Sequence, residues 1–226
     1  FDLHPPGYEF HDGRGLRVSP VHDRLAAKGA IFGESMGWER PKWFAPTGVE
    51  EQLSYTRSNA FPYIAKECLA VRDSVGVLDL TSFTKIEVSG QNATAFLDRT
   101  LANKLPRKIG GIALCHLLGD TGVTEAEMTV TRLADDRYLL LSAGSMQLRD
   151  FDQLNKALND DGSVQIHDVT ESYGCLVVTG PKARELLSKT TSADLSNAAF
   201  PWMSARKIDI AGVDTLALRV SYAGEL

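Results

Sequence analysis

The sequence has few cysteines and no long apolar run. Its three cysteines, Cys68, Cys115 and Cys175, are far apart and odd in number, so no disulfide framework is expected. A reducing compartment is the simpler inference: the cytoplasm, or the mitochondrial matrix if the protein is eukaryotic. No apolar stretch approaches the roughly 20 residues that span a bilayer, and the first residues have no signal-peptide layout. We therefore expect no membrane span.

Several chemical signatures are also missing. The chain contains no G-x-G-x-x-G fingerprint, no Walker loop and no serine-hydrolase elbow. Its five histidines have no metal-ligand spacing with the cysteines, so no metal site is expected. The net charge of −5 argues against a nucleic-acid partner, which needs a clustered basic surface. Cys115 and His116 are neighbours in a predicted strand and point to opposite faces, which argues against a thiolate–imidazole pair.

The chain otherwise has ordinary globular composition, with 226 residues, 43% of them hydrophobic and 23% charged. Amphipathic periods predict helices at 60–73, 92–101 and 146–158. Alternating or apolar runs predict strands at 84–88, 112–118, 137–142, 164–169 and 175–179, and a hairpin turning at Ala211-Gly212. The sum predicts an α+β fold of antiparallel hairpin sheets with packed helices. The chain lacks an initiator Met and stops directly after a strand pattern, so we expect an excised piece, truncated at its C-terminus.

Three further expectations concern burial and loops. Residues 33–44 hold three aromatic residues, prolines and charges, and are predicted to be an ordered loop over aromatic packing. In the helix at 60–73, Ile64, Cys68 and Val71 are expected to form the inward stripe. The strands at 77–80 and 175–179 are expected to be buried, the second because its apolar run is unbroken.

The segment 122–133 predicts a strand entered from a tight turn. Its alternation places Ala126, Met128 and Val130 on one face. The other face would carry Glu125 and Glu127, about 7 Å apart along the strand. Two interpretations stay open: a solvated outer face, or a carboxylate at the floor of a ligand site.

Five segments together carry a resemblance to a known family. These are 19–38, 77–85 (VLDLTSFTK), 122–130 (GVTEAEMTV), 179–181 (TGP) and 221–225 (SYAGE). Their order resembles that of the glycine cleavage T-protein (aminomethyltransferase) family. Residues 14–20 (RGLRVSP) and 38–44 (WERPKWF) are similar to the junction in sarcosine and dimethylglycine dehydrogenases, where a flavin-containing half precedes a folate-binding half.

The resemblance implies a T-protein-like fold that binds tetrahydrofolate and transfers a one-carbon unit from a small N-methyl amine-derived donor. FAD is expected only in a covalently preceding domain that this chain does not contain. Glu127 matches the key acidic residue of the family, an aspartate there, and is implied to be catalytic. Glu225 and Tyr222 match the Tyr-x-Gly-Glu motif that holds the pterin. Leu114 and Phe83 stand where many T-proteins have a tyrosine and a methionine, and are implied to line the folate site.

The resemblance also gives the expected organisation: residues 1–18 as a linker or the tail of an upstream flavin domain, and 19–226 as the folate-binding domain. Within the latter, 84–160 is expected to be an inserted βαββα subdomain. Two alternatives to the transfer function remain: a non-catalytic regulatory or folate-binding module, and a folate-dependent demethylase acting on another methyl donor.

Overall fold

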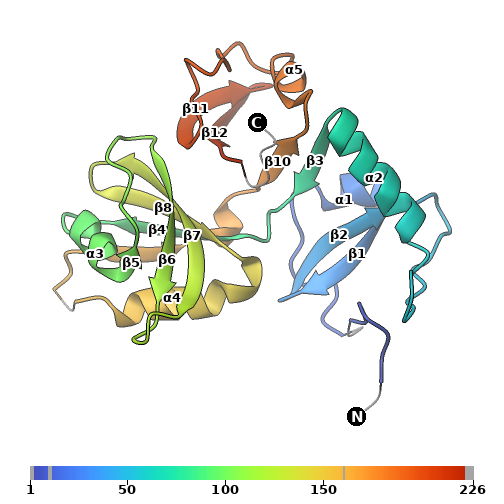
Figure 1. Cartoon of the computed structure of the whole chain (residues 1–226), viewed down its shortest axis with the longest axis horizontal. Coiled ribbons are helices and arrows are strands. Elements are labelled where there is room, and N and C mark those ends of the chain that lie inside the picture. The colour runs from blue at the N-terminus through green and yellow to red at the C-terminus, as the bar shows by residue number, and fades with distance from the viewer. Residues whose placement is uncertain (1–2, 10–11, 160, 222–226) are drawn as a thin grey trace. The chain divides into compact units, whose positions relative to one another are not determined.

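The fold is described from a computed structural model, which describes residues 3–9, 12–159 and 161–221. The chain forms two compact units, and each of them is discontinuous in sequence (Figure 1). The first unit combines Phe1–Ser82 with Gly174–Ala183, and the second combines Phe83–Tyr173 with Arg184–Leu226. The predicted boundaries of the linker at 1–18 and of the insertion at 84–160 stay predictions.

The second unit is built on a six-stranded antiparallel sheet in the order β5-β6-β7-β8-β4-β9. Its strands are β4 (Thr84–Ser89), β5 (Leu101–Ala102), β6 (Ile112–Leu118), β7 (Thr124–Ala134), β8 (Arg137–Ser142) and β9 (Gln165–Asp168). The predicted strands at 84–88, 112–118, 137–142 and 164–169 are confirmed. The predicted hairpin at 207–220 is also confirmed, as β11 (Ser204–Ile210) and β12 (Val213–Arg219). Its turn residues Ala211 and Gly212 have φ of 52° and 85°, as a type I′ turn requires.

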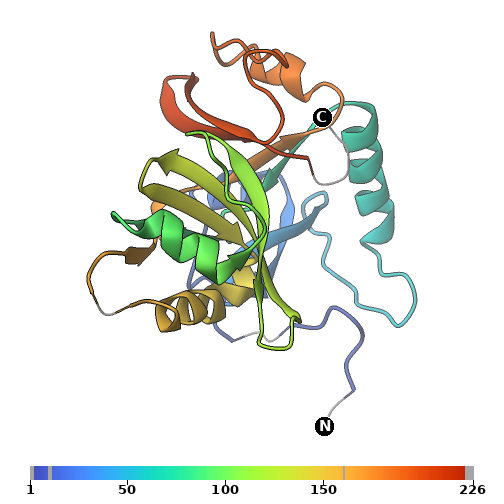
Figure 2. The same cartoon turned by 60° about the vertical axis from the view of Figure 1, so that its left-hand side comes forward.

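One face of the six-stranded sheet is covered by the helices α3 (Ala93–Thr100) and α4 (Gln147–Lys156), which Figure 2 shows beside the sheet. The predicted helices at 92–101 and 146–158 are thereby confirmed. Phe96 and Leu97 of α3 and Leu154 of α4 pack into one core with Met128 and Val130 of β7. The short helices η1 (Gly144–Met146) and η2 (Thr170–Ser172) join the main elements, and α5 (Ala183–Leu187) begins at the unit boundary.

In the first unit, residues 33–44 form a hairpin and not the predicted loop. The unit contains α1 (His22–Ala27), β1 (Ala30–Ser35), β2 (Trp38–Phe44), α2 (Phe61–Asp73), β3 (Gly76–Asp79) and β10 (Leu176–Thr179). Strands β1 and β2 pair antiparallel around Met36 and Gly37, which have φ of 53° and 81°. Pro41 is tolerated because this sheet has only two strands, which leaves an edge position for a residue without an N–H. Aromatic packing is confirmed, since Trp43 is buried and its ring lies 5.3 Å from that of Tyr63.

Two burial predictions for the first unit are wrong. In α2, Ile64 and Cys68 are exposed, and no residue of this helix is fully buried. Apolar residues occur on both sides of α2, with Phe61 and Leu69 also exposed, so the helical period alone could not select the packed face. Within residues 3–9, 12–159 and 161–221, the strands β3 and β10 pair with each other and with no further strand, so their apolar side chains stay at least partly exposed.

A carboxylate of β2 links residues 14 and 15 to the hairpin of the first unit. The Arg14 Nε and Nη2 donate to Glu39 Oε1 and Oε2 at 2.8 and 2.6 Å, and the Gly15 N–H donates to Oε1 at 2.7 Å. These bonds, the one from Arg14 foremost, hold the pKa of Glu39 below its usual range. Its charge therefore stabilises the fold above the unfolded-state pKa and loses this effect as the pH falls through the folded-state pKa.

We predict that Glu39→Gln lowers the free energy of unfolding by about 1 kcal/mol at pH 7, a small value because Arg14 is partly exposed and solvent screens the pair. Urea denaturation at several pH values measures the difference between the two proteins. The difference in the free energy of unfolding should be largest at pH 7 and should shrink below about pH 4.3, the unfolded-state pKa of glutamate. A difference that stays constant down to pH 2 would contradict this account.

In the second unit, Asp150 of α4 is 2% exposed and accepts a hydrogen bond from the Ser142 hydroxyl at 2.6 Å. Burial raises the pKa of Asp150, and the bond from Ser142 only partly offsets that rise. A raised folded-state pKa means that ionisation opposes folding. The penalty is absent below the unfolded-state pKa and is complete above the folded-state pKa.

Asp150→Asn should therefore gain stability relative to the natural protein as the pH rises from about 3.9, the unfolded-state pKa of aspartate, to neutrality. Asn keeps an oxygen acceptor for Ser142 and removes the buried charge. Thermal melts at pH 3 and pH 7 provide the measurement, with Ser142→Ala as a control that leaves the carboxylate buried and without this donor. If the stability of the variant relative to the natural protein is higher at pH 3 than at pH 7, the predicted direction of the pH dependence is wrong.

Candidate functional site

The candidate site lies on the face of the six-stranded sheet that α3 and α4 do not cover, which we call the outer face. The pairing of β6 with β7 decides which residues lie on this face: His116 is opposite Glu127, and Leu114 is opposite Thr129. Directly paired residues share a face, and alternate residues along a strand share it too. The residues between them, Cys115 and Met128, are 0% and 1% exposed in the core. The predicted facing of Met128 and Val130 is thereby confirmed.

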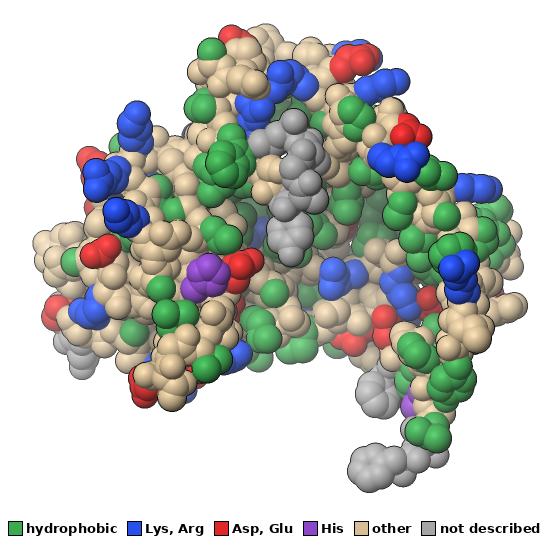
Figure 3. Space-filling view, viewed as in Figure 1, with side chains coloured by type: hydrophobic (Ala, Val, Ile, Leu, Met, Phe, Trp, Pro, Cys, Tyr) green, Lys and Arg blue, Asp and Glu red, His purple; other side chains and the backbone are tan. Residues whose placement is uncertain are grey.

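Glu127 and His116 form a polar pair on the outer face. The His116 Nε2 and the Glu127 Oε2 are 3.3 Å apart, and the two side chains are 35% and 53% exposed. Figure 3 shows an imidazole beside a carboxylate over β6 and β7. The pair is open to solvent, so a ligand could reach the carboxylate without moving the core beneath it.

Glu125 does not belong to this pair, which corrects the prediction that two carboxylates share one face. The pairing shifts between Leu117 and Leu118, because Leu117 lies opposite Ala126 and Leu118 opposite Thr124. Glu125 is the extra residue of this bulge, and a bulge breaks the alternation of side chains. Its carboxylate instead forms an ion pair with Arg149 of α4, and Arg149 Nη1 also donates to the Glu125 carbonyl at 3.2 Å. Glu127 is left as the carboxylate of β7 on the outer face.

Leu114 supplies an apolar surface next to this carboxylate. It is two residues from His116 on β6, is 40% exposed and lies on the outer face. Its carbonyl accepts a hydrogen bond from the Asn103 side chain at 2.7 Å, which ties the strand to the turn after β5. The structure therefore brings Leu114 and Glu127 together on neighbouring strands of one face.

Phe83 lies elsewhere on the same unit, directly before β4, with β8 between β4 and β7. It is half-buried, and its carbonyl accepts a hydrogen bond from the Lys85 Nζ at 2.9 Å. By register, Lys85 is opposite Leu141, which is opposite Thr129, so Lys85 also belongs to the outer face. The other two predicted site residues, Tyr222 and Glu225, lie outside the described residues.

His116 and Lys85 are outer-face residues that the sequence reasoning did not select. His116 was considered only with its neighbour Cys115, which points into the core, where burial raises the pKa of the thiol and keeps it protonated. The turn at 119–122 alone could not have identified His116, because regular counting back from Leu118 opposite Thr124 places His116 opposite Ala126. Only the bulge at Glu125 moves His116 opposite Glu127.

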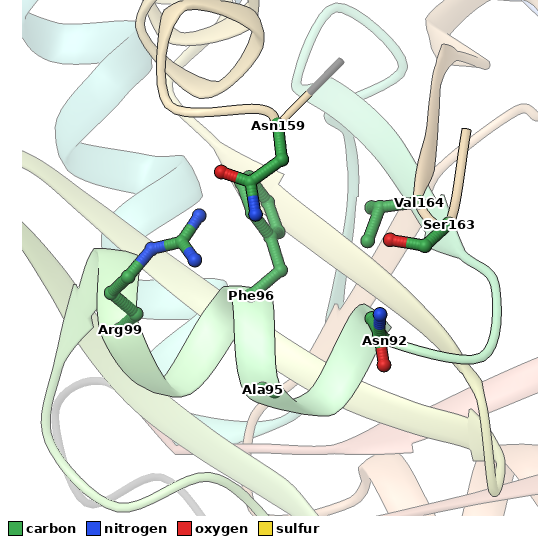
Figure 4. A pocket seen from close by; sticks show the side chains of 7 residues that line it. All are labelled: Asn92, Ala95, Phe96, Arg99, Asn159, Ser163 and Val164. Atoms are coloured by element: carbon green, nitrogen blue, oxygen red, sulfur yellow. The ribbon is translucent and has the colours of Figure 1, made fainter. Parts of the chain in front are cut away.

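A separate hollow of about 210 Å³ lies on the helix side of the sheet (Figure 4). The side chains of Arg99 and Asn159 lie toward one end of it, and those of Asn92 and Ser163 toward the other. Its lining residues are Asn92, Ala95, Phe96, Arg99, Asn159, Ser163 and Val164. None of the predicted site residues that the structure describes lines this hollow, so the hollow and the outer face are distinct.

The outer face combines a carboxylate, an apolar side chain and a buried hydroxyl. Glu127 is an exposed acceptor and Leu114 an exposed apolar surface beside it. The Thr131 hydroxyl, on the same face of β7, is 0% exposed and has no hydrogen-bond partner in the described chain. A flat, partly apolar ring with N–H donors at its edge, such as a pterin, could contact Glu127 and Leu114.

In the described part of the chain, no group of three or more His, Cys, Asp and Glu side chains is placed to hold a metal ion. Among the residues that the structure describes, no helix is long and apolar enough to cross a membrane.

Comparison with known proteins agrees with the resemblance stated from the sequence. The model of one protein family, described as the GCVT N-terminal domain, matches residues 21–226. Dimethylglycine dehydrogenase, mitochondrial, from Mus musculus is 36% identical over 213 residues, which are 93% of this chain and 24% of that protein. Sarcosine dehydrogenase, mitochondrial, from Homo sapiens is 31% identical over 254 aligned residues, covering 95% of this chain and 28% of that protein. The chain thus spans about a quarter of the length of these relatives.

Among solved structures, the chain is similar to the glycine cleavage system aminomethyltransferase T from Bartonella henselae. The TM-score is 0.72 at 24% identity, over 93% of this chain and 52% of that one. At this identity the likeness shows the fold, and it confirms the predicted α+β, T-protein-like architecture.

Proposed function

The chain belongs to the GCVT N-terminal domain family, and from that premise we propose that it is the folate half of a flavin-linked N-methyl amine dehydrogenase. In this role it binds tetrahydrofolate and assists the transfer of a one-carbon unit from an amine-derived donor. The substrate is an amine of the sarcosine or dimethylglycine type, in line with the names of the two relatives.

The observation that carries the proposal is the placement of Glu127. Its carboxylate stands exposed on a rigid sheet, beside the apolar side chain of Leu114. Glu125, the other carboxylate in this part of β7, is held by Arg149. The geometry therefore offers one acidic group to a ligand on this strand, and it is the residue that matches the family's key acidic position.

Each residue has a separate task in the proposed site. Tetrahydrofolate, when bound, supplies the nitrogen atoms that accept the one-carbon unit. Glu127 accepts a proton or a hydrogen bond from the folate nitrogens, because a carboxylate within reach of an N–H can act as a general base. Leu114 and Phe83 exclude water from the apolar part of the pterin. Glu225 accepts the forked N–H donors at the ring edge, and Tyr222 supports it.

In this proposal, another part of the longer protein carries out the flavin chemistry. This chain contains no G-x-G-x-x-G fingerprint to receive a dinucleotide, so we derive no step through FAD here. FAD would oxidise the amine in a covalently preceding domain, and a reducing compartment, cytoplasmic or mitochondrial, suits the three free cysteines.

We predict that Glu127→Gln, in the full-length protein that carries this chain, lowers one-carbon transfer to tetrahydrofolate by 10²-fold or more. Loss of a positioned general base typically has an effect of this size. Flavin reduction by the amine should stay unchanged. Methylenetetrahydrofolate formation in single-turnover experiments provides the measurement.

Glu125→Gln is the matched control for this substitution. It removes the same charge from the same strand, but from a carboxylate paired with Arg149 on the other side of the bulge. Transfer by Glu125→Gln should stay within about twofold of the natural protein, with at most the small stability loss of a partly exposed ion pair. Equal loss of transfer in both variants would remove Glu127 from its special role.

Glu225→Gln should weaken binding of 5-formyltetrahydrofolate, a stable reduced folate, by about 10-fold or more. The substitution removes a charge-assisted bidentate pair with the pterin, which is about twice as strong as a neutral one. Equilibrium titration followed by ligand fluorescence or calorimetry gives the dissociation constant. An unchanged constant would exclude Glu225 from the pterin pocket.

The same titration separates the alternatives. A natural protein that fails to bind reduced folates would indicate a regulatory module on this scaffold. Binding without any transfer from a sarcosine- or dimethylglycine-type donor would indicate either a folate-binding module or a demethylase for another methyl donor. Binding should also raise the melting temperature, since a ligand at 100 times its dissociation constant stabilises the folded state by about 2.7 kcal/mol.

A further inference from the structure

The pair formed by His116 and Glu127 is held in place from below by the core of the sheet. The two residues lie opposite each other across β6 and β7, and their neighbours Cys115 and Met128 are fixed in the core. The Nε2–Oε2 distance of 3.3 Å leaves the other carboxylate oxygen, Oε1, available to a ligand. The backbone under the pair is therefore rigid, and only the two side chains must be ordered.

The pair contributes little to stability, because exposed ion pairs and cross-strand pairs stabilise the folded state by about 1 kcal/mol or less. Its chemical consequence is larger, because the imidazole contacts the carboxylate that the proposed reaction uses. An Nε2–H donor at this place can fix the orientation of the Glu127 carboxylate.

Other charged groups on the outer face have different partners. By register, Lys85 and Glu87 of β4 lie on this face, with β8 between their strand and β7. The Lys85 Nζ donates to the carbonyls of Phe83 and Thr170 at 2.9 and 3.2 Å. Glu87 pairs with Arg137 of β8 at 2.6 Å and lies opposite His167 of β9. The described contact of the Glu127 carboxylate is with His116.

We propose that His116 is a positioning residue of the folate site. This inference rests on the proposed function and extends it to a residue outside the family's acidic and Tyr-x-Gly-Glu positions. The Nε2–H of neutral His116 donates to Glu127 Oε2 and aims Oε1 at a folate N–H. A proton that leaves the folate nitrogen goes to Glu127, since the Nε2 of His116 already carries the hydrogen that it donates.

The first test examines the pair without any ligand. The ¹⁵N chemical shift of the His116 Nε2 is measured by NMR, and its signal is assigned by its loss in His116→Gln. Replacing the charged acceptor in Glu127→Gln should change this chemical shift, because a hydrogen bond to a carboxylate is stronger than one to an amide oxygen. Glu125→Gln should leave it in place. A His116 Nε2 chemical shift that is the same in Glu127→Gln and in the natural protein would overturn the proposal.

The second test uses 5-formyltetrahydrofolate as the probe. His116→Gln keeps an N–H donor but cannot titrate, and His116→Leu loses both properties. We expect binding by His116→Gln to stay within about twofold of the natural protein, and binding by His116→Leu to weaken about fivefold. Thermal melts of both variants should match the natural protein, which excludes a folding defect.

A third measurement follows the pair when the probe binds. Saturating probe should change the His116 Nε2 chemical shift in the natural protein, since the bound ligand and His116 share one carboxylate, and should change it less in Glu127→Gln. A probe that binds the natural protein and His116→Leu equally, with no change in this chemical shift, would refute the inference while leaving folate binding intact. A natural protein that does not bind the probe would instead refute the proposed function, and the ligand-free chemical shift would still decide whether the pair exists.

Discussion

The burial of alternate residues along β7 is the constraint on which the candidate site depends. Met128 and Val130 are 1% and 0% exposed, and they pack against α3 and α4. Each buried side chain of this size contributes about 1.5–3 kcal/mol. A register slip of one residue would exchange Met128 with Glu127, which would expose one and bury the charge of the other. The core thus holds Glu127 on the outer face, although Glu127 itself contributes little to stability.

The same strand shows how one irregularity separates two chemically identical groups. The bulge at Glu125 adds a residue to β7 before the regular pairing begins, and this breaks the alternation at that point. One glutamate then joins an ion pair with α4, and the other stays with an imidazole on the outer face. The role proposed for Glu127 therefore depends on backbone geometry as much as on residue type.

The six-stranded sheet presents different chemistry on its two faces. On the helix side, aliphatic and aromatic side chains form one continuous core, in which the buried Asp150 is tolerated with a bond from Ser142. On the outer face, Leu114 and Glu127 are exposed on neighbouring strands, and the hydroxyl of Thr131 is buried further along β7. The proposed folate site uses the exposed pair, which offers an apolar surface and an acceptor to a flat ring with N–H donors.

Sequence alone determined the elements whose pattern is local. The alternation of 112–118 and 122–133, the helical period of 92–101 and the turn at Ala211-Gly212 all follow from side chains close together in the chain, and the family resemblance followed from the order of short motifs. Tertiary structure decided what depends on partners far away. The exposure of Ile64, Val77 and Leu176 depends on how many strands or helices pack against them. The separation of Glu125 from Glu127 and the meeting of Glu127 with His116 depend on a bulge and a register, because strand pairing joins residues that no local period relates.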